Sequence, residues 1–318
     1  MSGLGYETDM TGKWHVKIPP GEIFDHVGTE RPGMPGDTPE GYHRPRSRND
    51  TLWQPWDRRF GGFWDGGTHW SEVVANETIT FLDSASNSDN PFFMYVAFNA
   101  PHEPRQSPRK YVEIYSAEEM DVPPSFLPEY PYKEEMGCGP GLRDELLAPF
   151  PRTEYAVRVH RQEYYAIITH MDAQIGRILE RLEEHGMRKN THIFFTSDHG
   201  LSVGHHGLLG KQNMYDHSMR SPLIVAGPHI PEGEEREMAV YLQDIVPTAI
   251  ELAGGQVPPY VEFSSLKELI LKERSQSYND GVYGAYTDRQ RMIRVGDYKL
   301  IVYPYAEIRR LFHLEEDP

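Results

Sequence analysis

The segment FFTSDHGLSVGHHGLLGKQNMYDHSMRSPLIV, from Phe194 to Val225, is rich in side chains that could do chemistry. Asp198 and His199 directly follow an apolar run, and a carboxylate oxygen beside an imidazole nitrogen can bind a divalent metal ion. Gly200 then allows the backbone to turn sharply away. Taken as two residues alone, the pair is explained more simply by an aspartate that caps a following helix beside a solvent-facing histidine.

The same segment holds Lys211, and the composition makes individual lysines informative. The 318 residues carry a formal net charge of -16, which repels polyanions at long range. Nucleic acid is therefore not expected as a partner, and an anionic substrate would need a local basic pocket. Any lysine close to a strand end is a candidate for that pocket.

The composition is that of an ordinary globular protein, with 38% hydrophobic and 25% charged residues. No apolar run approaches the roughly 20 residues that a membrane-spanning helix requires. The first residues, MSGLGYETDM, lack the basic and apolar regions of a signal peptide, so the sequence assigns no compartment. Cys138 is the single cysteine, which excludes an internal disulfide.

Two apolar strands are predicted to deliver polar residues to their carboxyl ends. PFFMYVAFNA, residues 91–100, runs into PHEP and His102, while THIFFTS, residues 191–197, runs into Asp198. Between them lies a long helix that stops at Gly186. Its apolar residues recur at three- and four-residue steps, at Ile168, Met171, Ile175, Ile178 and Leu182. Strand, helix and strand in that order predict a crossover unit in a largely parallel sheet, where ligands bind at the carboxyl ends of strands.

The remaining segments complete a predicted α/β fold. Residues 71–86 are expected to form an amphipathic helix, 221–227 (SPLIVAG) a further strand, and 244–253 another helix. After GGQVPP, the short candidates VYGAYTD, QRMIRVGD and YKLIVYPY predict a small antiparallel sheet. Residues 1–70 are predicted to be ordered loop, and 107–151 a Pro-rich excursion.

Several of these segments, in this order, resemble the sulfatase family of the alkaline phosphatase superfamily. TSDHG, GHHGLLGK and YDHSMRSPLIV are similar to its C-terminal signature. Four further segments resemble other motifs of the family: GYETDMTGKWH, PFFMYVAFNAPHEP, QDIVPTAIELAG, and YKLI with LFHLEEDP. The resemblance spans nearly the whole chain. It implies an alkaline phosphatase-like sandwich of a large, mostly parallel sheet between helices, with a catalytic core at residues 1–255 and a partial, small antiparallel C-terminal subdomain at residues 256–318.

The resemblance implies catalytic roles for two lysines and two histidines. Lys13 and Lys211 would hold the sulfate, and His102 together with Lys211 would protonate or stabilise the leaving oxygen. His15 would act as the base that breaks down the sulfated intermediate. Without the resemblance, each lysine would be interpreted as an ordinary surface residue and each histidine as a structural one.

The resemblance also implies a divalent metal ion bound by Asp198 and His199. Ca²⁺ is the expected metal, with Mn²⁺ or Mg²⁺ as alternatives. His206 matches the family's usual HG histidine, but His205 stands where an acidic residue is common. Neither of these two histidines is therefore assigned as a ligand.

The family's nucleophile is not found among these residues. Sulfatases convert a Cys or Ser in a C-x-P-S-R or C-x-A-x-R box to formylglycine, and an Asp-Asp pair upstream completes the metal site. Neither pattern occurs in the sequence, so formylglycine is expected on a missing N-terminal segment, and this chain alone is expected to be an inactive fragment. Cys138 lies in CGPGL, which lacks the Ser and Arg of the box, and is predicted to be an unremarkable loop thiol.

The predicted function is that of a sulfuric ester hydrolase acting on a small-molecule or carbohydrate sulfate ester. One alternative is a phosphodiester or phosphonate ester hydrolase of the same superfamily, because the same groups serve phosphorus chemistry; another is a catalytically inactive oxyanion-binding homologue. Family members are often periplasmic or secreted, but compartment and oligomeric state stay open. The site residues are predicted to converge on one pocket at the carboxyl edge of the sheet, namely Lys13, His15, His102, Asp198, His199 and Lys211.

Overall fold

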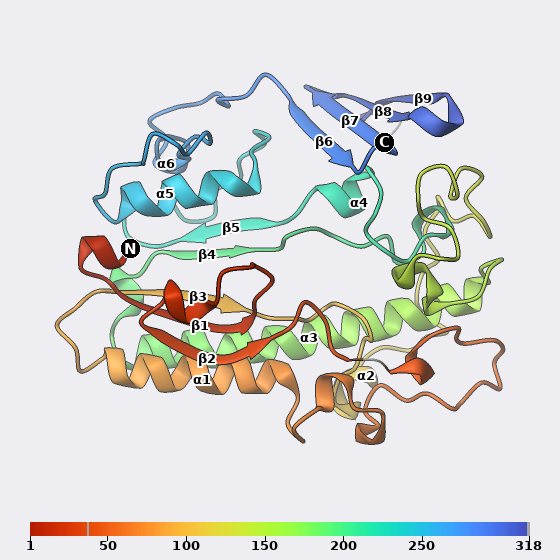
Figure 1. Ribbon diagram of the computed structural model, residues 1–318, viewed down its shortest axis with the longest axis horizontal. Coiled ribbons are helices and arrows are strands. Elements are labelled where there is room, and N and C mark those ends of the chain that lie inside the picture. The colour runs from red at the N-terminus through yellow and green to blue at the C-terminus, as the bar shows by residue number, and fades with distance from the viewer. Residues whose placement is uncertain (37, 317–318) are drawn as a thin grey trace. The chain divides into compact units, whose positions relative to one another are not determined.

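A computed structural model of the chain describes residues 1–36 and 38–316 (Figure 1). The chain divides into two compact units. Unit 1 comprises Met1–Glu129, Arg143–Arg188 and Val203–Leu209, and unit 2 comprises Tyr130–Leu142, Lys189–Ser202 and Gly210–Pro318. Within the described residues, no helix combines the length and apolar character needed to cross a membrane.

Unit 1 is built on a parallel sheet of three strands. Its elements are β1 (Glu7–Lys13), β2 (His26–Arg31), α1 (Trp70–Ala85), β3 (Phe92–Ala97), α2 (Arg109–Val112) and α3 (Glu154–Glu184). The strand order is β2-β1-β3, and the central strand pairs in parallel with both neighbours. Helix α1 packs on this sheet and α3 runs beside α1 (Figure 1). The predicted helix at 71–86 and strand at 91–100 are confirmed as α1 and β3. The prediction of ordered loop throughout residues 1–70 is wrong, because β1 and β2 lie in this stretch and pair in the sheet.

The carboxyl end of β1 is fixed by a glycine. Gly12 has a φ of +96°, and a Cβ atom at this position would lie 2.0 Å from the backbone oxygen of Ala97 in β3. Glycine alone combines this conformation with this approach. Lys13 therefore ends β1 at the same edge of the sheet at which β3 ends.

Helix α3 stops where its sequence predicts, before Gly186, but buries a different face from the predicted one. The Thr153 side chain accepts a hydrogen bond from the backbone N–H three residues on, and Gly186 has a φ of +69°. Of the predicted apolar stripe, only Leu182 is fully buried. The buried residues are Ala156, Val157, His160, Glu163, Ala166, Ile167, His170, Gln174 and Leu182. Glu163 is buried because it pairs with Arg44, which is 119 residues away and invisible to local periodicity.

Unit 2 holds two antiparallel sheets. Its elements are β4 (Ile193–Thr196), α4 (Asp216–Met219), β5 (Leu223–Ala226), α5 (Ile245–Leu252), α6 (Lys267–Ile270), β6 (Val282–Tyr286), β7 (Gln290–Val295), β8 (Tyr298–Tyr303) and β9 (Ile308–His313). The predicted strand at 221–227 is confirmed as β5, but it pairs with β4 in antiparallel register and so does not continue the parallel pattern. A parallel pair needs a connection of about a dozen residues or more. Residues 197–222 between β4 and β5 are long enough for that, so the length of the connection did not predict the direction of pairing.

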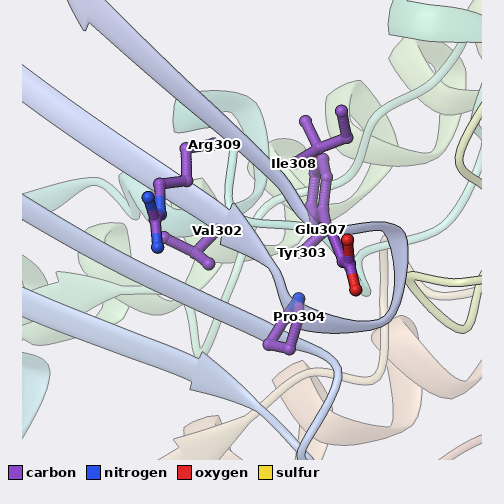
Figure 2. A pocket seen from close by; sticks show the side chains of 6 residues that line it. All are labelled: Val302, Tyr303, Pro304, Glu307, Ile308 and Arg309. Atoms are coloured by element: carbon purple, nitrogen blue, oxygen red, sulfur yellow. The ribbon is translucent and has the colours of Figure 1, made fainter.

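The C-terminal sheet confirms the predicted small antiparallel sheet. Strands β6, β7, β8 and β9 pair antiparallel in chain order. A hollow of about 490 Å³ lies at the turn between β8 and β9, lined by Val302, Tyr303, Pro304, Glu307, Ile308 and Arg309 (Figure 2). No residue predicted from the sequence to act on substrate or metal lines this hollow, so it is not the candidate active site.

Asp9 in β1 offers a test of the buried sheet through pH. Its side chain is 6% exposed, and burial raises the pKa of its carboxyl from 3.8 to about 6. The folded state therefore binds this proton more tightly than the unfolded state does. Proton binding stabilises the fold fully below about pH 4, and this stabilisation is lost as the pH rises through about 6. Asp9→Asn removes the titration, so we expect its unfolding free energy relative to the wild type to rise by up to about 3 kcal/mol between pH 4 and pH 7.5.

Urea denaturation of the wild type and of Asp9→Asn at pH 4 and pH 7.5 measures the change in their difference in unfolding free energy. Asp89→Asn is the matched control, because Asp89 is exposed on the same unit. Equal pH dependence for the two variants would show that Asp9 is not a buried, proton-binding carboxyl.

Candidate active site

Lys13 and His15 are positioned by the way β1 ends. Lys13 is partly buried, and Trp14 after it packs edge-on against Phe24 and Tyr95, with ring centroids 5.8 and 6.1 Å from its own. This packing anchors the backbone at Trp14, while His15 is exposed. The lysine and the histidine thus lie two residues apart at the carboxyl edge of the sheet.

Gly33, in the loop after β2, makes room for the imidazole of His15. A Cβ atom on Gly33 would lie 3.2 Å from ring atoms of His15, which is closer than an ordinary contact. The loops after β1 and β2 therefore meet at this imidazole.

His102 lies in the loop after β3, in a defined tautomer. Its backbone N–H donates to the Asn99 oxygen at 3.0 Å, and its Nδ1 lies 3.2 Å from the backbone oxygen of Glu103. Because a carbonyl oxygen can only accept, Nδ1 carries the proton, and Nε2 is the basic nitrogen of the neutral ring. The Asn99 amide nitrogen donates to the Pro32 oxygen at 2.7 Å, which ties the loop after β3 to the loop after β2.

Asp198 and His199 stand two and three residues beyond β4. The Oδ1 atom of Asp198 accepts from the backbone N–H of His199 at 3.1 Å, and Nδ1 of His199 lies 3.0 Å from the Gly200 oxygen. His199 therefore presents Nε2, which lies 3.5 Å from Oδ2 of Asp198. In the described structure, the first helical turn after Asp198 starts at His205 and has Gly204 as its N-cap. Asp198 therefore caps no helix, and the helix-capping interpretation is wrong.

Backbone contacts hold the loop after β4 against the segment that carries the candidate lysine. A Cβ atom on Gly200 would lie 2.0 Å from the His217 oxygen, and the Gly200 N–H donates to the Ser218 oxygen at 2.9 Å. The Ser202 N–H donates to the oxygen of Gly210, the residue before the lysine, at 2.9 Å. Within unit 2, the Asp-His pair and the lysine are therefore parts of one folded loop cluster.

The residue after Lys211 is held by two groups that sequence reasoning did not identify. The carbonyl oxygen of Gln212 accepts from the Cys138 thiol at 2.8 Å and from the Gln290 side-chain amide at 2.7 Å. Gln290 is fully buried and also donates to the Met136 oxygen. The buried thiol of Cys138 thus supports a backbone, whereas a reactive thiolate needs an exposed, electropositive setting. No sequence signal linked these residues, because the contacts join distant segments.

His205 and His206, left unassigned from the sequence, lie in unit 1. Nδ1 of His205 is 2.9 Å from the Ser125 hydroxyl, and burial lowers the pKa of His205. His206 has a φ of +56°. Both residues belong to a tight turn packed on the Pro-rich excursion.

The donors suited to a metal ion are the Asp198 carboxylate and Nε2 of His199. In residues 1–36 and 38–316, no group of three or more His, Cys, Asp or Glu side chains is arranged to hold a metal ion. The pair supplies one oxygen-bearing and one nitrogen ligand, which fits a metal that completes its sphere with water, substrate or other oxygen donors.

The structure groups the predicted residues in two sets. Lys13, His15 and His102 follow neighbouring strands of one sheet in unit 1, and their expected placement at its carboxyl edge is observed. Asp198 and Lys211 belong to the loop cluster of unit 2. The convergence of both sets on one pocket stays a prediction.

Comparison with known proteins gives matches along the whole chain. The sulfatase family profile matches residues 1–255, and a profile for the C-terminal part of N-sulphoglucosamine sulphohydrolase matches residues 204–318. An arylsulfatase of Clostridium perfringens is 30% identical over 284 residues, which are 85% of this chain and 55% of that protein. This chain spans about half the length of the curated relatives that it matches.

Two solved structures share the fold. One, solved in complex with its substrate D-glucosamine-2-N,6-O-disulfate, has a TM-score of 0.74 and 22% identity, covering 100% of this chain and 74% of that chain. The phosphonate monoester hydrolase of Silicibacter pomeroyi has a TM-score of 0.76 and 18% identity, covering 99% of this chain and 72% of its own. These similarities confirm the predicted α/β, alkaline phosphatase-like fold class.

Gln290→Leu tests the support beneath Lys211. The substitution keeps a buried side chain of similar size but leaves the Met136 and Gln212 oxygens without the donated amide hydrogens. We expect the unfolding free energy to fall by about 1–3 kcal/mol, as measured by urea denaturation. The exposed Gln276→Leu is the matched control, and equal stability of the two variants would contradict the assigned role.

Proposed function

This chain belongs to the sulfatase family, and we propose that it supplies the sulfate-binding and metal-binding residues for hydrolysis of a sulfate monoester. The supporting observation is where the family's polar residues stand. Lys13 is the last residue of β1, and Asp198 follows β4 after a single intervening residue. Strand ends of this kind are where α/β proteins bind ligands.

The proposed roles follow from the charge that the reaction develops. Cleavage of a sulfate monoester places negative charge on the equatorial oxygens and on the leaving oxygen. Lys13 and Lys211 would bind the sulfate oxygens. His102 would act with Lys211 at the leaving oxygen, donating from Nε2 when its ring is protonated, and His15 would accept a proton as sulfate is released.

Asp198 and His199 would hold the divalent metal ion that members of this family generally use. We propose Ca²⁺, with Mn²⁺ or Mg²⁺ as alternatives, because a carboxylate oxygen suits all of them. The metal would neutralise charge on the bound sulfate. The family also generally uses formylglycine, which supplies the nucleophilic oxygen, and we assign no residue of this chain to that role.

Phosphonate monoester hydrolysis is the second candidate function. The phosphonate monoester hydrolase of Silicibacter pomeroyi shares the fold, and two lysines with a metal ion would stabilise charge on phosphorus oxygens as on sulfur oxygens. A choice between the two therefore requires a direct comparison of substrates.

Binding and turnover of 4-nitrophenyl sulfate by the purified chain test the proposal. With Ca²⁺ or Mn²⁺ present, we expect the chain to bind this ester in calorimetry, and Lys211→Ala to weaken binding by roughly 10- to 100-fold through loss of a charged hydrogen bond. We expect no release of nitrophenolate above the level of that variant. Lys189→Ala, which removes an exposed lysine of the same unit, should bind as the wild type does.

Three outcomes would count against parts of this account. Equal binding by the Lys211→Ala and Lys189→Ala variants would remove Lys211 from the site. Tighter binding of 4-nitrophenyl phosphonate than of the sulfate would favour the second function. Multiple turnovers that Cys138→Ala abolishes, while binding of the ester stays at the wild-type level, would make that thiol the nucleophile and not only a support of the backbone beside Lys211.

A further inference from the structure

Unit 1 has a recess apart from the candidate active-site residues. Residues 43–59 contain five arginines, two aspartates and two tryptophans, in a chain whose net charge is -16. Part of this stretch, with residues of α2 and α3, encloses a recess of about 200 Å³. We call it the Trp56 recess; its lining includes Arg48, Asp50, Trp53, Trp56, Tyr155 and Gln162. This volume is below the roughly 300–1,000 Å³ of pockets for drug-sized ligands, which suits one residue of a longer ligand.

The inner wall of the recess carries no net charge. Arg44 and Glu163 line it, form a two-pronged ion pair, and have side chains that are 7% and 3% exposed. A buried pair of this kind is rigid, because separating it would leave an uncompensated charge in the interior. Arg44 is therefore part of the scaffold and not a group for binding a ligand.

Arg48 at the rim is held far more loosely. Its side chain is 72% exposed and its guanidinium carbon lies 4.9 Å from the centre of the Tyr155 ring. Its ion pair with Glu118 spans 4.0 Å, and Glu118 is itself 68% exposed. Pairs this exposed contribute little free energy, so Arg48 can give up Glu118 for the anionic group of a ligand at small cost.

Aromatic rings in the lining of the recess favour a sugar as the ligand. Trp56 is partly exposed and carries the Arg109 guanidinium 5.4 Å from its ring centre, and Tyr155 lies under Arg48. Aromatic faces pack against the C–H faces of sugar rings, and a guanidinium binds sulfate or carboxylate oxygens in pairs. An acidic sugar residue offers both kinds of group.

The recess adjoins the loop that carries His102. A Cβ atom on Gly41 would lie 3.2 Å from the Trp53 ring and 3.2 Å from Pro104, two residues after His102. Trp53, which lines the recess, is thus separated from the His102 loop by the thickness of a glycine backbone. A ligand in the recess would contact Trp53, whose ring packs through Gly41 against the loop of the residue proposed to act on the leaving group.

We propose that the Trp56 recess binds an acidic sugar residue of the same saccharide chain that carries the scissile sulfate. Arg48 would bind its sulfate or carboxylate, and Trp56 would pack against its ring. The inference rests on the proposed function and narrows its substrate from sulfate esters in general to acidic oligosaccharides.

Calorimetry on the full chain with defined tetrasaccharides tests this inference. A κ-carrageenan tetrasaccharide presents sulfate alone, a tetragalacturonate presents carboxylate alone, and maltotetraose is neutral. We expect Arg48→Ala to weaken binding of the matching acidic probe about tenfold or more. Trp56→Ala should weaken that binding too, and both variants should keep the wild-type melting temperature.

Arg46→Ala is the matched control, since Arg46 is exposed in the same stretch but does not line the recess. It should change the affinity by less than about threefold, as expected of a screened surface charge. Equal losses for Arg46→Ala and Arg48→Ala would reveal general attraction to a basic stretch and overturn the inference. Wild-type affinity for maltotetraose equal to that for both acidic probes would also overturn it, as would no binding of either acidic probe.

The failure of this inference is distinguishable from failure of the proposed function. If Lys211→Ala abolishes binding of 4-nitrophenyl sulfate while Arg48→Ala leaves the tetrasaccharides unaffected, the recess is not a subsite and the proposed function stands. If Arg48 and Trp56 are needed for acidic probes but Lys211 is not needed for the aryl sulfate, the recess binds acidic sugars without the proposed chemistry.

Discussion

Two close approaches of one backbone to another determine where the chemistry-bearing side chains stand. At Gly12 and at Gly200, a Cβ atom would lie 2.0 Å from a carbonyl oxygen of a neighbouring segment. The first contact ends β1 beside β3 and so fixes Lys13; the second presses the loop bearing Asp198 and His199 against α4. Each glycine stands next to a polar residue of the candidate site, and a residue with a Cβ atom could not approach the neighbouring backbone so closely.

Charge is handled differently in the interior of unit 1 and at its rim. Arg44 and Glu163 neutralise each other where both are buried, which gives the α3 face and the inner wall of the Trp56 recess a fixed geometry at the expense of apolar packing. Arg48, only a few residues along the chain, stays exposed and weakly paired. A buried neutral pair beside an exposed, weakly paired cation is an arrangement that can bind an anionic ligand without reorganising the core.

Local sequence patterns predicted most elements, because caps, periodicity and turn residues act over a few positions. The stop of α3 at Gly186, the strand leading to His102 and the antiparallel C-terminal sheet all follow from such signals. The antiparallel pairing of β5 with β4 did not follow from such signals, because the connection between the two strands is long enough for either direction of pairing. The buried pair of Arg44 and Glu163 could not be predicted from local patterns, and neither could the support of the backbone beside Lys211 by Gln290. Both contacts join segments far apart in the chain, and neither Glu nor Gln signals burial by its residue type.

The central claim is that the lysines of both units bind one sulfate next to one metal ion. A crystal structure of this chain grown with inorganic sulfate and Mn²⁺ tests it most directly. The account predicts a sulfate within about 2.7–3.2 Å of Nζ of both Lys13 and Lys211, and an anomalous peak for manganese at Asp198 and His199. Sulfate ions bound separately at the two lysines, or manganese bound away from the Asp-His pair, would contradict it.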